Sequence, residues 1–337
     1  MAKRLDYIDA TKGVAILCIT LLHFEQGVIP TWLNTWIGLF MISAFYVTSG
    51  WVSGINNKEV RPNELLKKRI KQLGIPYFWF SLLIITFDIL WVLLGFMESN
   101  TLLRDVYKTI VLRGIGTLWF LPVLLIGEYI FTIIRNSKQK LLLGSCALLI
   151  TLAANFAYNT WWSPMRELSE INKIIDAPMQ PIVRGLYAWP IIAIGFITAK
   201  KWGHNILKTG RIKLLCISAA LFAISFILVI KPPFNIYYVN GVLSNTLPAI
   251  AFMCLFALFK RNFITRFFCY WGINSLVLMC THFSITMEIL MAIDKYVLHH
   301  ATFEGLRTII YFVICVILTY PLVRLFNGKL KFMLGKR

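Results

Sequence analysis

Long apolar runs alternate with short polar segments along the whole chain. A helix needs about 20 apolar residues to cross a hydrocarbon core of about 30 Å. The pattern therefore predicts ten membrane-spanning helices, at residues 13–30, 36–55, 75–96, 117–134, 141–158, 181–199, 213–230, 238–259, 269–292 and 307–326. This fold class is an all-α, polytopic integral membrane helix bundle, and we expect no appended soluble domain.

Two segments between the predicted spans are longer than the others. Residues 56–74 contain the pattern of a short amphipathic helix that follows Pro62, with Asn63 as its candidate cap. Residues 158–180 are predicted to form the longest loop on the opposite side, where Trp161 and Trp162 suit the aromatic belt of a membrane interface.

The basic residues indicate how the helices are oriented. The net charge is +19, but Lys and Arg stand in short clusters between the apolar runs, which is the positive-inside pattern of membrane proteins. If the N-terminus is cytoplasmic, 25 of the 34 Lys and Arg residues fall on the inner side. Both termini are therefore predicted to be cytoplasmic, and nucleic acid is not expected as a partner.

The cysteines and the N-terminus limit the remaining possibilities. The seven cysteines lie in or beside apolar runs without a Cys-x-x-Cys pair, so we expect neither a disulfide framework nor a metal site. The first apolar run has no small-x-small cleavage site, which predicts an uncleaved first span instead of a signal peptide.

The first predicted span carries Lys12 and His23, eleven positions apart. Eleven helical steps turn about 1100°, close to three full turns, so both side chains share one stripe about 16 Å apart. With Lys12 at one membrane edge, His23 would lie near the midplane, where an ionisable residue usually has a function. A histidine that is hydrogen-bonded inside the bundle is the structural alternative.

Acidic residues are candidates for orienting His23. Asp9 lies about 21 Å away along the helix, so it should instead pair with Lys12 at i, i+3. Glu25 is two positions further on and points elsewhere. Glu128 in the fourth span is therefore the candidate, and an ion pair with an inner lysine is its alternative role.

Two further motifs flank the third and fourth spans. Arg69 and Lys71 belong to a basic cluster at the predicted cytoplasmic mouth, where a guanidinium suits a phosphate and where simple topological anchoring is the alternative. Leu118–Leu121 reads Leu-Trp-Phe-Leu, which taken alone is an ordinary pattern for the aromatic belt where a span begins.

Polar residues also occur in the ninth span. His282 follows Ser275 by seven positions, about two turns along one helix face, and Asn274 stands beside Ser275. Hydrogen bonds between helices would explain all three. We expect Asn274 and Ser275 to be structural.

Four of these motifs resemble, in the same order, those of acyltransferase family 3, the integral membrane O-acyltransferases. They are the basic residue ten positions before histidine at 12–23, the arginine before Pro-Tyr at 69–77, Leu-Trp-Phe-Leu at 118–121, and Gly-x-Asn-Ser-Leu with a later histidine at 272–282. The chain is most similar to short, stand-alone members that acetylate surface glycans in bacteria. It departs from the family at Gln72, where a second arginine is usual, and at Met279, where a tyrosine is usual.

The resemblance implies one membrane domain over residues 1–337, multi-pass in a bacterial plasma (inner) membrane. It implies transfer of an acyl group, usually acetyl, from cytoplasmic acetyl-CoA, a co-substrate, to a sugar hydroxyl, with no tightly bound cofactor; a longer acyl chain is the alternative. The implied roles are general base for His23; acetyl-CoA binding for Lys12, Arg69 and Lys71; acceptor or site lining for Trp119, Phe120, Glu128 and His282; and structural motif for Asp9, Asn274 and Ser275.

The expected partners are the lipid bilayer, acetyl-CoA and a glycan acceptor, either free or polyprenyl-linked. The sequence leaves the choice between monomer and homo-oligomer open. A transporter or flippase for a lipid-linked sugar or small solute is the main alternative, because ionisable residues within many spans suit one. A sensor without turnover is a further alternative.

Overall fold

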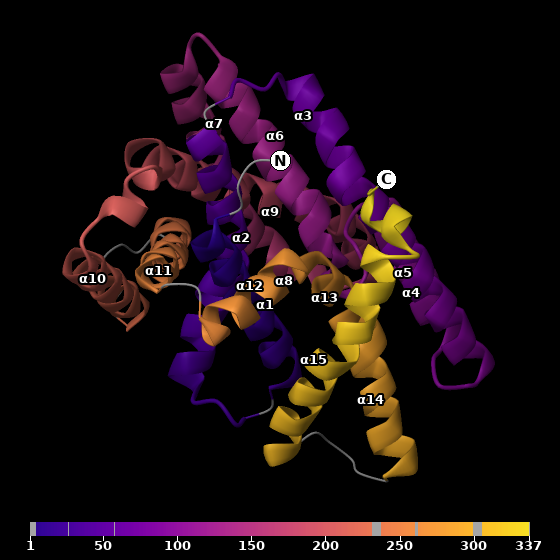
Figure 1. Ribbon diagram of the computed structural model, residues 1–337. Coiled ribbons are helices and arrows are strands. Elements are labelled where there is room, and N and C mark those ends of the chain that lie inside the picture. Colours follow the sequence, from indigo (N-terminus) through magenta and orange to yellow (C-terminus); the bar gives the residue numbers. More distant parts are fainter. Residues whose placement is uncertain are drawn as a thin grey trace. The chain divides into compact units, whose positions relative to one another are not determined.

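The computed structural model describes residues 5–25, 27–56, 58–230, 237–259, 262–298 and 305–336, without the side chains of residues 237–240 (Figure 1). The described residues form helices, turns and bends and contain no strand. Ten of their helices are long and apolar enough to cross a membrane, one for each predicted span. The predicted all-α, polytopic membrane fold is therefore confirmed, and the orientation of the termini stays a prediction.

The helical segments are, in chain order, α1 (Asp6–Phe24), α2 (Thr31–Asn56), α3 (Pro62–Arg69), η1 (Ile70–Gly74), α4 (Ile75–Leu93), α5 (Ser99–Ile110), η2 (Gly116–Trp119), α6 (Phe120–Asn136), α7 (Lys140–Ala157), η3 (Tyr158–Trp162), α8 (Ser163–Arg166), α9 (Glu170–Thr198), η4 (Ala199–Gly203), η5 (Ile206–Lys208), α10 (Arg211–Ile230), α11 (Tyr237–Leu258), α12 (Phe263–Ile273), α13 (Ser275–Thr281), η6 (His282–Met287), α14 (Glu288–Ala292), η7 (Ile293–Val297), α15 (Leu306–Asn327) and η8 (Lys331–Leu334). Some consecutive segments join into a longer continuous helix, as α3, η1 and α4 do over Pro62–Leu93.

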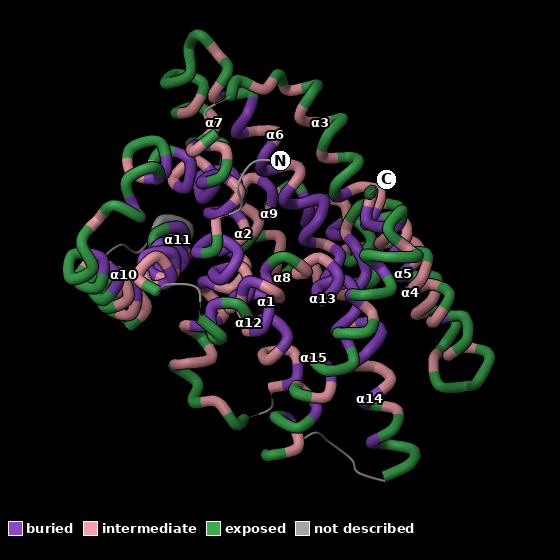
Figure 2. The backbone as a smooth tube through the Cα atoms, in the orientation of Figure 1, coloured by how far each residue is buried: buried purple, intermediate pink, exposed green. Residues whose placement is uncertain are grey.

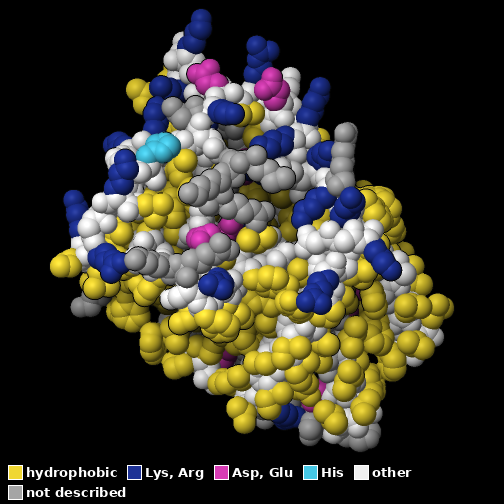
Figure 3. Space-filling model, in the orientation of Figure 1, with side chains coloured by type: hydrophobic (Ala, Val, Ile, Leu, Met, Phe, Trp, Pro, Cys, Tyr) yellow, Lys and Arg dark blue, Asp and Glu magenta, His cyan; other side chains and the backbone are white. Residues whose placement is uncertain are grey.

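The surface is rich in large apolar side chains, as expected for a protein whose solvent is lipid. Leu141, Leu149, Ile212 and Ile317 are among the most exposed of them, and hydrophobic side chains cover much of the face drawn in Figure 3. Most of α1 is buried, whereas most of α10 is not (Figure 2). The buried helix is the one that carries Lys12 and His23.

The described residues form two compact units, and we describe each by itself. Unit 1 contains residues 1–58, 191–282 and 286–320. In it, α1 packs against α2, α11, α12 and α13, and α1 and α12 cross in close contact (Figure 1). A Cβ added to Gly13 would collide with the Phe268 carbonyl, and one added to Gly272 with the Asp9 carbonyl. Small residues at a crossing let two backbones touch, so these glycines hold α1 against α12.

Unit 2 contains residues 59–190, 283–285 and 321–337. In it, α6 packs against α3, η1 and α7, and α4 packs against α5 and η8. The Trp79 ring meets Phe332, and the Phe80 ring meets Phe326, so the last described residues pack against α4.

Prolines inside the helices create attachment points between neighbouring helices. Proline has no N–H, so the carbonyl four residues before it loses its helical partner. In unit 2, Pro178 leaves the Ile174 carbonyl without its helical N–H partner. The Tyr107 hydroxyl donates to this carbonyl at 2.8 Å. In unit 1, Pro248 does the same for Ser244, whose carbonyl accepts from the Ser225 hydroxyl at 3.2 Å. These contacts join α5 to α9 and α10 to α11.

The first predicted span has wrong boundaries. Its helix begins at Asp6 and ends at Phe24, so His23 lies in its last turn and not midway along it. Asp6 and Asp9 favour the early start, because acidic residues stabilise a helix N-terminus. The helix ends because Glu25 adopts an extended backbone conformation and its side chain accepts the N–H of Ile29 at 2.9 Å.

Two predictions about the polar segments are also wrong. Arg61 and not Asn63 precedes the first turn of α3, Pro62 is inside that turn, and no side chain caps it. The helix then continues through η1 into α4, where Pro76 has no N–H for the Gln72 carbonyl. The predicted loop at 158–180 is largely helical, because η3, α8 and the start of α9 occupy it.

Candidate functional site

His23 of α1 and His282 of the ninth span meet directly inside unit 1. Nδ1 of His23 lies 2.9 Å from Nε2 of His282, and the ring centroids are 5.0 Å apart. His282 is fully buried at 0% exposure, whereas His23 is half-buried. The pair joins residues 259 positions apart in the sequence.

The hydrogen-bond partners assign the protons of this pair when both rings are neutral. Nδ1 of His282 lies 2.7 Å from the Leu278 carbonyl, which can only accept, so Nδ1 carries the hydrogen. Nε2 of His282 is then an acceptor, and Nδ1 of His23 donates to it. With Nδ1 assigned as the donor, Nε2 is the unprotonated nitrogen of His23, and the Ile19 carbonyl is a further hydrogen-bond partner of this ring.

The local backbone positions the His282 ring. His282 opens η6, a π-helical segment between α13 and α14, and its backbone N–H also bonds to the Leu278 carbonyl. Single π turns within helices are frequent at functional sites. Beside the pair, Phe24 packs with Leu290, Tyr311 and Cys315 in a buried apolar cluster.

The other end of α1 holds Lys12 and Asp9. Lys12 Nζ lies 2.8 Å from Asp9 Oδ1, so the predicted i, i+3 ion pair is confirmed. Nearby on α1, the Tyr7 hydroxyl accepts a hydrogen bond of 3.0 Å from the buried Trp51 indole. Lys12 and His23 share one helix, and its rise separates them by about 16 Å.

Arg69 and Glu128 form an ion pair within unit 2. Arg69 Nη2 donates to Glu128 Oε1 at 2.5 Å, and Arg69 Nε lies 2.5 Å from Oε2. Arg69 Nη1 donates to Gln72 at 2.7 Å, so the residue that replaces the usual second arginine supports the first. Glu128 is 4% exposed. Its partner is thus an arginine, not the lysine considered from the sequence.

The remaining candidates of unit 2 make contacts of their own. Trp119 is half-buried, with the Arg184 guanidinium 4.4 Å from its ring centroid, and Phe120 is buried. Lys71 is exposed, and its backbone carbonyl lies against Gly335.

Asn274 and Ser275 mark the break between α12 and α13. The Asn274 amide donates to the Tyr270 carbonyl at 2.8 Å, while its backbone leaves the helical region. Ser275 begins α13. The break therefore lies about two helical turns before His282.

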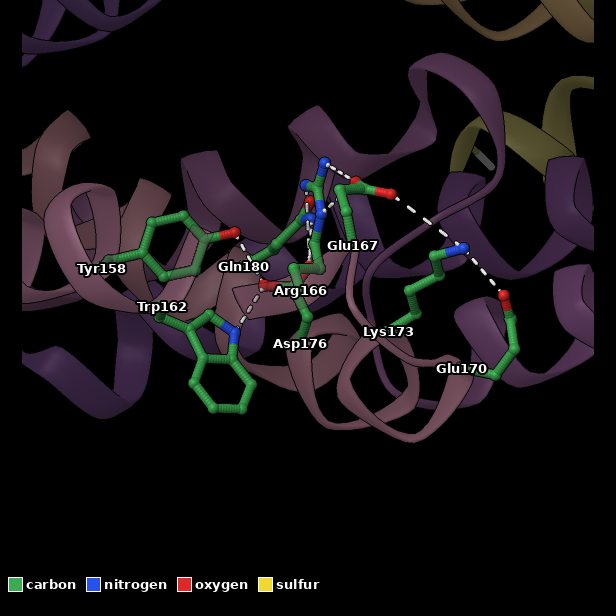
Figure 4. A network of polar contacts seen from close by, with 8 residues as sticks. All are labelled: Tyr158, Trp162, Arg166, Glu167, Glu170, Lys173, Asp176 and Gln180. Carbon is green, nitrogen blue, oxygen red and sulfur yellow. Dashed lines mark hydrogen bonds and ion pairs between the residues drawn. The ribbon is translucent and has the colours of Figure 1, made fainter. Parts of the chain in front are cut away.

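The sequence interpretation missed a polar network around Asp176 (Figure 4). Residues 158–180 were expected to be an interfacial loop, and Trp162 was assigned to the aromatic belt. Its indole instead donates to Asp176 at 3.0 Å. The signal was present in the spacing of Asp176, Gln180 and Arg184, which repeat every four residues as on one helix face.

The fold and the histidine pair define a polytopic membrane protein in which a half-buried and a fully buried imidazole from two helices meet. The chain belongs to acyltransferase family 3, because that family's acyltransferase domain matches residues 5–326. It is therefore a membrane acyltransferase. No curated protein matches the chain, and no solved structure does so either.

Proposed function

We propose that this protein is a membrane O-acetyltransferase that moves an acetyl group from cytoplasmic acetyl-CoA to a hydroxyl of a sugar in a surface or lipid-linked glycan. Family membership supplies the acyl transfer. The observation that supports the site is the hydrogen-bonded pair of His23 and His282. A sugar hydroxyl is a weak nucleophile near neutral pH, and an imidazole is the side chain best suited to take its proton there.

In the proposed reaction, the sugar oxygen attacks the thioester carbonyl carbon of acetyl-CoA as its proton passes to Nε2 of His23. The C–S bond then breaks, the acetyl group stays on the sugar oxygen, and the CoA thiolate takes up the proton. During the attack His23 becomes a cation whose Nδ1–H donates to His282. A hydrogen bond to a charged group is stronger than one between neutral groups, so His282 favours the protonated state that forms during attack.

The proposed donor site uses basic residues on the predicted cytoplasmic side. CoA is a polyanion that enters from the cytoplasm, and a contact with its phosphates is proposed for Lys12 in unit 1 and, separately, for Arg69 and Lys71 in unit 2. Lys12 already neutralises Asp9 and Arg69 already neutralises Glu128. Each pair keeps a cation at a fixed position, and a phosphate would share that cation with the carboxylate.

The experiment uses purified protein in proteoliposomes, acetyl-CoA labelled in the acetyl group, and a panel of sugars and lipid-linked sugars. We expect label in the acceptor, retained after CoA is removed, for the wild type and not for His23→Ala. Uptake of an unmodified sugar without acetyl transfer would instead support the transporter alternative. A matched control is His204→Ala, which removes an exposed histidine.

A further inference from the structure

A stripe of polar side chains runs along α9 within unit 2. Asp176, Gln180 and Arg184 are four residues apart and lie on one face of this helix. The helix belongs to a segment that is long and apolar enough to cross a membrane. Polar and ionisable residues in such a segment are costly and commonly mark the path of a substrate or ion.

Asp176 at the start of this stripe is fully engaged by neighbouring residues (Figure 4). Its Oδ1 accepts from the Tyr158 hydroxyl at 2.8 Å and from the Trp162 indole at 3.0 Å. Its Oδ2 accepts from the Gln180 amide at 2.6 Å, with Arg166 at 3.8 Å. A carboxylate has about four acceptor positions, and Asp176 is 2% exposed. This carboxylate therefore fastens η3 and α8 to α9.

Arg113 lies within electrostatic range of this network and is not part of its hydrogen bonding. It is half-buried, and it makes no hydrogen bond or ion pair with any residue that the structure describes. The second acid in its range, Asp105, bonds to Lys108 at 2.6 Å. Burial holds the pKa of Arg113 below its usual range. A half-buried guanidinium that makes no direct hydrogen bond to the described residues keeps its donors available for a planar anion.

The turn that carries Arg113 is held in an uncommon conformation. Leu112 has φ +61°, a value rarely adopted by a residue with a branched side chain, and Gly114 and Gly116 are also left-handed. A Cβ on Gly114 would collide with the backbone nitrogen of Trp119. The turn therefore packs closely against the backbone of Trp119. The Arg184 guanidinium lies 4.4 Å from the centroid of the Trp119 ring.

A buried acceptor also lies on the stripe. The Gln180 Oε1 atom has no hydrogen-bond partner among the described residues, although the side chain is 2% exposed. The same amide group donates through its nitrogen to Asp176. Unpaired buried polar atoms are rare in folded proteins and call for an explanation.

We propose that Arg113, together with Arg184 and Trp119, forms a subsite for an anionic group carried by the acceptor saccharide, either a phosphate or a sugar carboxylate. The planar guanidinium of Arg113 would make two parallel hydrogen bonds to this group. A hydroxyl of the same sugar would donate to Gln180 Oε1. That the ligand is the acetyl acceptor rests on the proposed function. Binding of the anion to this subsite does not depend on acetyl transfer.

The experiment measures binding to purified protein in detergent without acetyl-CoA, by saturation-transfer NMR titration. The probes are a hexose 1-phosphate, the corresponding uronic acid and the neutral hexose. We expect an anionic probe to bind, and Arg113→Gln to weaken it about ten- to hundredfold, as for the loss of charge-assisted hydrogen bonds. Preference for the phosphate or for the uronic acid identifies the source of the anion.

The matched control is Arg104→Gln, which removes the same charge from an exposed position on α5. Thermal unfolding of both variants reports whether they fold, and Arg113→Lys keeps the charge while losing the planar fork. The proposal is overturned if the neutral hexose binds as tightly as both anions, if no probe binds, or if Arg104→Gln weakens binding as much as Arg113→Gln. Specific binding by a protein that transfers no acetyl group would contradict the proposed function and leave the subsite standing.

Discussion

Replacing His282 with alanine removes the side-chain acceptor of His23 Nδ1 and leaves the Ile19 carbonyl as a backbone partner of the ring. When His23 becomes an imidazolium, the hydrogen bond to His282 has a charged donor, and such bonds contribute about 1.5–3 kcal/mol. Losing it should lower kcat about ten- to hundredfold. His23→Ala removes the general base itself, for which the expected loss is about 10²–10⁴-fold.

The losses of activity caused by replacing His23 and His282 should also be non-additive. Because His282 acts through His23, the double variant should lose no more activity than His23→Ala alone. His282→Gln should recover part of the loss, since an amide oxygen can accept from His23 Nδ1. In the wild type, kcat should rise with pH as the imidazole loses its proton, a limb that His282→Gln keeps and any residual activity of His23→Ala lacks.

The assay is transfer of labelled acetyl under saturating substrates, expressed per folded molecule. That correction matters because His282 is fully buried and its truncation leaves a cavity. His204→Ala, at an exposed position, is the control. Wild-type activity per folded molecule in His282→Ala, or losses that multiply in the double variant, would refute the paired mechanism.

Three other predictions test the structure more broadly. Arg69→Ala should leave its buried carboxylate partner unpaired and destabilise the fold by about 3–5 kcal/mol, which thermal unfolding would report; weaker CoA binding at unchanged stability would instead indicate a pure donor role. Gly272→Ala should destabilise the crossing of α1 and α12, while Gly210→Ala, with open space around it, should not; equal melting temperatures would contradict this. Cysteines placed at Lys138 and Lys173 should label from the cytoplasmic and the opposite side respectively, and the reverse pattern would overturn the predicted orientation.

Local patterns in the sequence were sufficient for the ten membrane-spanning helices and for the Asp9–Lys12 contact, but not for the bounds of the first helix or for the helical segments within 158–180. Ten apolar runs yielded ten helices because the length of a run and its apolar composition are properties of the segment alone. The Asp9–Lys12 ion pair is an i, i+3 contact within one helix, which helical geometry predicts without knowledge of the rest of the chain.

The partner of each candidate residue depended on packing between helices. Nothing near His23 in the sequence indicates His282, 259 positions away, because their contact requires α1 to pack beside α13. Arg69 similarly meets Glu128 through the contacts of α3 and η1 with α6. Helical periodicity specifies which face of a helix a residue occupies. Only the tertiary structure decides which helix that face meets, because this depends on close crossings such as that of Gly13 and Gly272.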